Sequence, residues 1–172
     1  MTTIFTTGHS NTPAEVLLSQ LAAARIKTLV DIRRYPGSRR NPQYSSTALG
    51  ASLKDACIDY RHFEALGGRR KPRPDSPNAG LTSDQFRGYA DYMDTPEFDA
   101  AVARLVELAD AAPTAVMCAE AVPWRCHRSL LADALVARGH EVIHLIGGAQ
   151  KRHRPTPVAR IEDGRVTYPA LL

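Results

Sequence analysis

Residues 114–139, TAVMCAEAVPWRCHRSLLADALVARG, pass from an apolar run through a cluster of reactive side chains into a regularly spaced apolar pattern. The run at 114–119 is typical of a buried strand, and the pattern at 126–139 predicts a helix that ends at Gly139. A buried strand that leads through a polar loop into a helix is the unit from which parallel α/β sheets are built. This stretch therefore decides the fold class.

The rest of the chain alternates between the same two patterns. Strands are expected at 3–8, 27–33, 58–63 and 141–146, and helices at 13–25, 46–57, 82–93 and 95–112. Asn11 or Thr12 should cap the first of these helices, and Asp163-Gly164 predicts a C-terminal β-hairpin. The expected fold is a single three-layer α/β domain over residues 1–172. Its open, mostly parallel sheet should have about five strands, Rossmann-like or flavodoxin-like, flanked by helices.

Composition is that of an ordinary globular protein, with 44% apolar and 23% charged residues. No apolar run approaches the roughly 18 residues of a membrane span, so no membrane partner is expected. The first ten residues, MTTIFTTGHS, resemble neither a signal peptide nor a transit peptide, which favours a cytoplasmic location. Three cysteines are too few and odd in number for a disulfide framework.

The net charge of +4 is modest, but the basic residues are unevenly distributed. Three segments marked by Pro, Gly or both hold 11 of the 22 lysines and arginines, at 33–40 (RRYPGSRR), 69–73 (RRKPR) and 151–154 (KRHR). Each is expected to be a loop that follows the carboxyl end of a strand. Three loops of one sign favour a polyanionic partner: nucleic acid, a nucleotide or another phosphorylated ligand. The Pro and Gly content of 67–80 is also compatible with a mobile lid.

Polar residues follow each expected strand. The first strand ends in Gly8-His9-Ser10, the second leads into Asp31 and Arg33, and the fourth ends at Cys118-Ala119-Glu120. In open parallel sheets, ligands bind beyond the carboxyl ends of the strands at a topological switch point. The sequence therefore predicts that these side chains converge on one edge of the sheet.

The cysteines of the opening stretch allow a metal or thiol interpretation. Cys118, Cys126 and His127 are suitable zinc ligands, and Glu120 is a candidate fourth. Structural zinc sites usually have closer pairs than the C-x7-C found here, and neighbouring residues 126 and 127 have difficulty reaching one tetrahedral ion. A phosphatase-type cysteine is also disfavoured, because the C-x5-R spacing is missed by one residue from Cys118 and position 132 is alanine.

An anion site fits the same stretch better. Free N–H groups at the start of the 126–139 helix favour negative charge, and arginines add bidentate contacts to phosphate oxygens. Glu120 is the candidate general acid or base, with His9 assisting. Asp31 is expected to orient arginines, with a role as base the lesser alternative. An alternative for Arg128 is a structural pair with Asp31 or Glu120. The expected phosphate-binding set is Ser10, Arg33, Ser38, Arg39, Arg125, His127 and Arg128.

These residues also carry a family resemblance. TTGHSN, LVDIRRYPGSRRNPQY, LGGRR, YADYM and CAEAVPWRCHRSLLADAL together resemble the family called domain of unknown function 488, in order from Thr6 to about Ile146. The resemblance implies a small bacterial or archaeal α/β protein and supplies no settled reaction. The family's characteristic positions map onto Gly8, His9, Ser10, Asp31, Arg33, Pro36, Ser38, Arg39, Pro42, Gly67, Gly68, Cys118, Glu120, Cys126, His127 and Arg128.

The leading functional expectation is an enzyme that acts on a nucleotide or nucleic acid by hydrolytic or glycosidic-bond chemistry, with Glu120 as acid or base. No cofactor is expected, because the sequence has no G-x-G-x-x-G, no G-x4-G-K and no carboxylate metal cluster. One alternative is a binding module for nucleic acid or nucleotides without catalysis. The second is a thiol or metal-binding protein that uses Cys118, Cys126 and His127.

Overall fold

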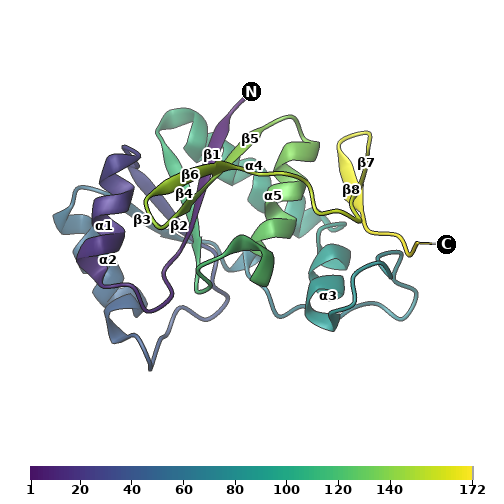
Figure 1. Cartoon of the computed structure of the whole chain (residues 1–172), viewed down its shortest axis with the longest axis horizontal. Coiled ribbons are helices and arrows are strands. Elements are labelled where there is room, and N and C mark those ends of the chain that lie inside the picture. The colour runs from purple at the N-terminus through teal and green to yellow at the C-terminus, as the bar shows by residue number, and fades with distance from the viewer. Residues whose placement is uncertain (172) are drawn as a thin grey trace.

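A computed structural model describes residues 1–171 and places six strands in one twisted sheet (Figure 1). Five strands are parallel and the sixth pairs antiparallel with β5 at one edge. This confirms the expected mostly parallel α/β sheet. In spatial order the strands are β3 (Asp59–His62), β2 (Thr28–Asp31), β4 (Thr114–Cys118), β1 (Thr3–Gly8), β5 (Glu141–Ile146) and β6 (Ala149–Arg152).

Helices cover both faces of the sheet, giving the three layers expected (Figure 1). Side chains along β4 alternate between two apolar cores. Ala115 and Met117 pack with α1 (Ala14–Ala23) and α2 (Ser46–Asp55), whereas Val116 and Cys118 belong to the larger core on the opposite face. That core is covered by α3 (Asp84–Tyr92), α4 (Pro96–Ala111) and α5 (Arg128–Ala137), and the short 3₁₀ helices are η1 (Pro42–Tyr44), η2 (Glu64–Leu66) and η3 (Pro123–Arg125).

Helices α2, α3 and α4 begin with ordinary side-chain caps, whereas α1 and α5 do not. The side chains of Ser45, Ser83 and Thr95 accept hydrogen bonds from the first turns of α2, α3 and α4. At α1 the cap is Pro13, which provides no side-chain hydrogen bond, so the expected cap at Asn11 or Thr12 was wrong. Proline is suited to a helix start because its fixed φ is close to the helical value.

The C-terminal hairpin is present, formed by β7 (Arg160–Glu162) and β8 (Arg165–Thr167). Asp163 and Gly164 have φ of 50° and 76°, as a two-residue type I′ turn requires. In Figure 1 this hairpin, in yellow, stands apart from the main sheet.

The third basic segment does not lie where the sequence predicted. Gly147 and Gly148 form a turn with positive φ, and β6 then runs back along β5. Arg152 consequently reaches Glu141 at the start of β5, with Nη2 3.6 Å from its carboxylate. Residues 151–152 are therefore part of a strand that leads away from the carboxyl edge, and the expectation of a loop there was wrong. Within residues 1–171, no helix is both long and apolar enough to cross a membrane.

Candidate functional site

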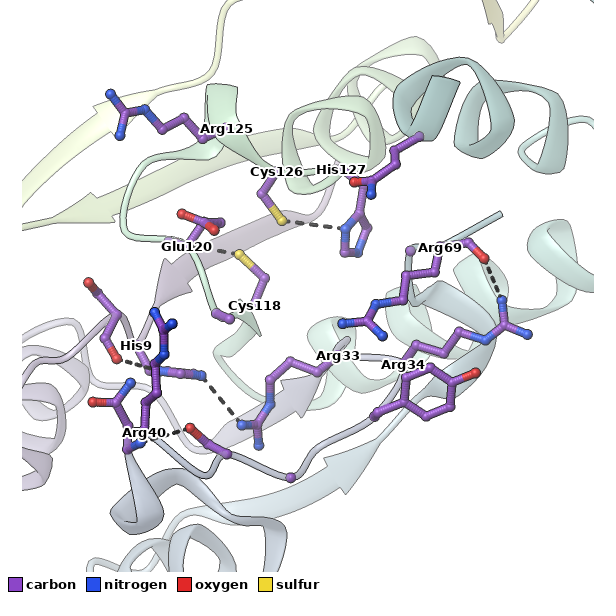
Figure 2. A pocket seen from close by; sticks show the side chains of 18 of the residues that line it. His9, Arg33, Arg34, Arg40, Arg69, Cys118, Glu120, Arg125, Cys126 and His127 are labelled. Atoms are coloured by element: carbon purple, nitrogen blue, oxygen red, sulfur yellow. Dashed lines mark hydrogen bonds between the residues drawn. The ribbon is translucent and has the colours of Figure 1, made fainter. Parts of the chain in front are cut away.

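A cleft of about 810 Å³ opens at the carboxyl edge of the sheet (Figure 2). Residues after β1, β2 and β4 line it, together with residues from the loop after η2 and from α3. The cleft is strongly basic, so it provides a favourable environment for a polyanion. Its charged lining consists of one carboxylate, that of Glu120, and six guanidinium groups, those of Arg33, Arg34, Arg39, Arg40, Arg69 and Arg125.

Arg33 is held in the floor of the cleft by Asp31. The two side chains form a bidentate pair, with Nε 2.9 Å from Oδ1 and Nη2 2.7 Å from Oδ2. The Arg33 backbone N–H also donates to Oδ1, and the Tyr60 hydroxyl donates to Oδ2 at 2.6 Å. Asp31 is fully buried and does not line the cleft. Four donors occupy its carboxylate, so the structure places Asp31 as an orienting residue and not among the groups that face a substrate.

His9 lies beside Arg33 at the end of β1. Its Nδ1 is 2.7 Å from the carbonyl oxygen of Ser10, and its Nε2 is 3.4 Å from Nη1 of Arg33. The ring stacks on Tyr44 with centroids 4.4 Å apart. Burial lowers the pKa of His9 below its usual value, against the opposing effects of the Ser10 hydrogen bond and of nearby carboxylates. The imidazole is therefore neutral at pH 7.

Glu120 faces the same cleft from the loop after β4 (Figure 2). Its side chain is exposed, in contrast with the partial burial considered from the sequence. Among residues 1–171, no hydrogen bond or ion pair occupies its carboxylate. It is thus available to a ligand.

Of the other expected phosphate contacts, Ser38 and Arg39 lie in the loop that follows β2, Ser10 follows β1, and Arg125 belongs to η3. Ser38 accepts a hydrogen bond from the Asn41 backbone N–H at 3.1 Å, which shapes the loop that presents Arg39. Ser10, with φ of 46°, lines the cleft beside His9. Arg39 and Arg125 are exposed, so their guanidinium groups can adjust to a bound anion.

Arg128 is the expected phosphate ligand that the structure does not bring to the cleft. Its side chain is fully buried and donates to the backbone carbonyls of Glu120 at 3.3 Å and Ala121 at 3.1 Å. It pairs with neither the Glu120 carboxylate nor Asp31, as the sequence had allowed. A Cβ on Gly8 would lie 2.7 Å from its Nη1. Arg128 therefore stabilises the backbone of the loop that carries Glu120, and it does not itself line the cleft.

His127 lines the cleft but carries no charge there. Burial lowers its pKa to about 4, and its Nε2 is buried without a hydrogen-bond partner in the part of the chain that the structure describes. Its Nδ1 lies 3.4 Å from the sulfur of Cys126. At neutral pH the ring therefore adds no positive charge to the cleft.

Cys118 and Cys126 face each other in the cleft wall (Figure 2). A hydrogen bond from the Cys126 thiol lowers the pKa of Cys118 and raises that of Cys126. Within residues 1–171, no group of three or more His, Cys, Asp and Glu side chains is arranged to hold a metal ion. The zinc set considered from the sequence therefore does not assemble here.

Comparison with protein families adds one match. A model of the family described as "Domain of unknown function DUF488" matches residues 13–135, which is well over half of the chain. The chain belongs to the DUF488 family. The matched segment includes Arg33, Glu120 and both cleft cysteines, and starts after His9 and Ser10. Comparisons with curated proteins and with solved structures gave no match.

Several cleft residues of this DUF488 protein were not singled out from the sequence. Arg34, Arg40 and Arg69 line the cleft, and their signal was present in the clustering of basic residues. Tyr60 does not line the cleft but contacts Asp31 beneath it, and the sequence did not indicate this contact, because it arises only from the pairing of β3 with β2.

The segment 67–80 is tied down in several places. Buried Asp91 of α3 accepts hydrogen bonds from the Arg73 backbone N–H at 2.8 Å, from Ser76 at 2.7 Å and from Asn78 at 2.7 Å. Arg70 lies over the Tyr92 ring, with Cζ 4.0 Å from its centroid. This DUF488 structure therefore presents Arg69 to the cleft from an ordered, hydrogen-bonded loop.

Proposed function

We propose that this DUF488 protein is a hydrolase that acts on a phosphate-bearing substrate, a nucleotide or a nucleic-acid strand, with Glu120 as general acid and base. The observation that carries the proposal is a single available carboxylate facing six guanidinium groups in one cleft. Guanidinium groups bind phosphate oxygens bidentately, and an excess of them tolerates a substrate with several negative charges.

The arginines divide into a fixed set and an adjustable set. Arg33 is buried and oriented by Asp31, so it supplies a donor whose position needs no rearrangement on binding. Arg39, Arg40 and Arg125 are exposed and can close on the ligand. The exposed arginines at the rim can make the first contacts with a phosphate group, and Arg33 at the floor can then hold that group in one position.

An aromatic side chain at the rim favours a substrate with a base. Tyr35 lines the cleft and is 60% exposed, and the guanidinium groups of Arg34 and Arg69 lie 5.8 and 5.3 Å from its ring centroid. Trp124, 64% exposed, precedes the cleft residue Arg125 in η3 and lies outside the cleft lining. Exposed aromatic rings among arginines stack on nucleobases while the arginines follow the phosphates. This supports a nucleotide or single strand over a bare phosphate monoester.

The test combines binding and turnover. Wild type, Glu120→Gln and Arg39→Ala are titrated with nucleotides and with short single-stranded oligonucleotides, and the products are analysed by chromatography. Glu107→Gln and Arg154→Ala are the matched controls, because both side chains are exposed and neither lines the cleft. We expect Glu120→Gln to bind and lose turnover by about 10² to 10⁴-fold. Arg39→Ala should bind about tenfold or more weakly, because it loses a charge-assisted contact.

Salt dependence distinguishes the two substrate classes. Affinity for an oligonucleotide should fall steeply as salt rises, whereas affinity for a mononucleotide should change far less. Binding without turnover in every protein would overturn the enzyme assignment and leave a binding module. If neither ligand binds and both cleft variants match the controls, the proposed function is wrong.

A further inference from the structure

The protonation state of His9 is fixed by its neighbours. The Ser10 carbonyl oxygen can only accept a hydrogen bond, so Nδ1 of His9, 2.7 Å away, must carry the proton. Ser10 has φ of 46°, in the left-handed region, a backbone conformation that is uncommon for serine. Since the ring is neutral, Nε2 has a free lone pair.

That lone pair points into the floor of the cleft and has only a weak partner. The Nη1 group of Arg33, 3.4 Å from Nε2, already donates to the Tyr44 carbonyl at 2.7 Å. Figure 2 shows the imidazole edge turned toward Arg33. The stacked Tyr44 ring prevents the imidazole from rotating, and the Tyr44 hydroxyl is itself bonded to the Thr12 carbonyl. The imidazole is therefore positioned as a nucleophile as well as a base.

We propose that His9 is the covalent nucleophile of this cleft and forms a phosphohistidine at Nε2 during hydrolysis of the phosphate monoester of a nucleotide. The inference deepens the proposed function and depends on it, because it assigns the reacting atom for the same phosphate-bearing substrate. The role suits this ring better than that of a mobile proton carrier, since the fixed Nδ1–H bond to Ser10 persists in every step.

The first half-reaction forms one bond and breaks one. The Nε2 lone pair attacks phosphorus, and the bond from phosphorus to the leaving oxygen breaks. The leaving oxygen takes the proton carried by the monoanionic phosphate of the substrate, passed on by the Glu120 carboxylate, which gives the free alcohol and leaves Glu120 ionised. The Arg33 Nη1 group, displaced from Nε2, then lies beside the transferred phosphoryl oxygens.

The second half-reaction restores the enzyme. Water attacks phosphorus, the N–P bond breaks, and its electron pair returns to Nε2 of His9. The Glu120 carboxylate takes one proton from that water and passes it to the departing phosphate, so inorganic phosphate leaves as the monoanion and Glu120 is again ionised. The sum is hydrolysis of a phosphate monoester, with no cofactor or oxidant needed.

The experiment traps the covalent form with two defined probes, p-nitrophenyl phosphate and phosphoramidate. Both have leaving groups that depart readily, so the Glu120→Gln variant should still be phosphorylated. It should then hydrolyse the adduct about 10² to 10⁴-fold more slowly, because glutamine cannot accept the proton of water. Intact-mass measurement is made after the probes are added to wild type, Glu120→Gln, and Glu120→Gln combined with His9→Ala. Glu120→Gln combined with His140→Ala is the matched control, because His140 precedes β5 at the opposite edge of the sheet.

We expect a burst of one equivalent of p-nitrophenolate and a mass gain of one phosphoryl group in Glu120→Gln and in the His140 control. The adduct should be acid-labile and base-stable, map to His9, and be absent when His9 is alanine. Turnover of either probe with no burst and no adduct overturns the nucleophile assignment and leaves the proposed hydrolase intact, with His9 as a base. If neither probe yields an adduct or product, the nucleophile assignment is also wrong, whereas the proposed function is decided by the nucleotide and oligonucleotide measurements above.

Discussion

Two buried arginines show how one residue type is used in opposite ways at this site. Arg33 pairs with a buried carboxylate and still lines the cleft, whereas Arg128 donates through Nη1 and Nη2 to backbone carbonyls and does not line it. From the sequence we expected both side chains at the carboxyl edge of the sheet, with Arg33 after a strand and Arg128 near the start of a helix. A guanidinium group can donate to carbonyl, carboxylate and phosphate oxygens, so its partner in the folded protein depends on packing that no local sequence pattern records.

The Asp31–Arg33 pair gives the first prediction. Asp31→Asn should lower the free energy of unfolding by about 3–5 kcal/mol, because it leaves a buried guanidinium group without its counter-charge. Tyr60→Phe removes one hydrogen bond to the same carboxylate and should cost only about 1 kcal/mol. Urea denaturation of the three proteins measures both effects. If Asp31→Asn lowered the free energy of unfolding by less than Tyr60→Phe does, Asp31 would not be the residue that holds Arg33 in place.

The three cysteines should differ sharply in reactivity. Cys57 is exposed, whereas Cys118 and Cys126 are buried, 1% and 7% exposed. Native protein treated briefly with iodoacetamide should therefore carry one label, on Cys57, and three labels after unfolding in urea. Peptide mass spectrometry locates the labels. Rapid labelling of Cys126 in the folded protein would show that the cleft wall opens more than the structure indicates.

At the level of the helices, Gly88 and Gly50 should respond in opposite ways to substitution by alanine. A Cβ on Gly88 of α3 would lie 1.8 Å from the Arg70 carbonyl oxygen, whereas one on Gly50 of α2 would meet only the Tyr60 ring at 3.8 Å. Gly88→Ala should therefore destabilise the protein by about 1–3 kcal/mol, since the 67–80 loop must shift. Gly50→Ala should stabilise it by about 0.5–1 kcal/mol through helix propensity. Thermal unfolding measures the signs, and equal signs would contradict the packing of α3 against that loop.

Whether a strand could be predicted from the sequence depends on how deeply its side chains are buried. The central strands are apolar runs buried on both faces, and β2 and β4 were recognisable for that reason. Strand β6, AQKR, is fully exposed and lacks alternation, so nothing in its sequence distinguishes it from a basic loop. Its position follows from pairing with β5 after a glycine turn, which is a tertiary effect.

The candidate site was predictable to a similar degree. Topology alone brings the residues after β1, β2 and β4 to one edge, and His9, Arg33 and Glu120 do meet in one cleft. The orientation of each side chain was not predictable. Asp31 turns into the sheet toward Tyr60, and the Glu120 side chain turns out into solvent, because of register and loop packing that the motif does not specify.

In the molecule as a whole, a series of contacting, mostly buried polar side chains connects the C-terminal segment to the sheet. Asp133 of α5 accepts from Tyr168 at 2.7 Å and contacts His153 at 2.7 Å. His153 in turn lies 2.8 Å from His144, which is 2.6 Å from the Thr6 hydroxyl. Burial, followed by the charges of His153 and Arg128, lowers the pKa of His144 to about 3.

The buried, neutral imidazoles of His127 and His144 make the stability of the protein depend on pH. Between the folded pKa values of His127, about 4, and His144, about 3, and the unfolded value near 6.5, the unfolded chain binds more protons than the folded chain. The unfolding free energy therefore rises with pH in this window. The stabilisation is complete above the unfolded pKa and is lost as pH falls toward the folded values.

Each of these two groups should lower the unfolding free energy by roughly 1 kcal/mol per pH unit once the pH is below about 6. His9, whose pKa burial also lowers, acts in the same direction. Urea denaturation from about pH 7 to about pH 5 measures the slope before most carboxylates titrate. His127→Gln keeps a polar side chain in place and removes one titrating group, so its slope should be smaller than wild type by about one bound proton. A stability that is flat across this range, or that increases on acidification, would mean that these rings are charged in the folded protein. The assignment of a neutral His127 in the cleft wall and of a neutral His144 beside Thr6 would then both be wrong.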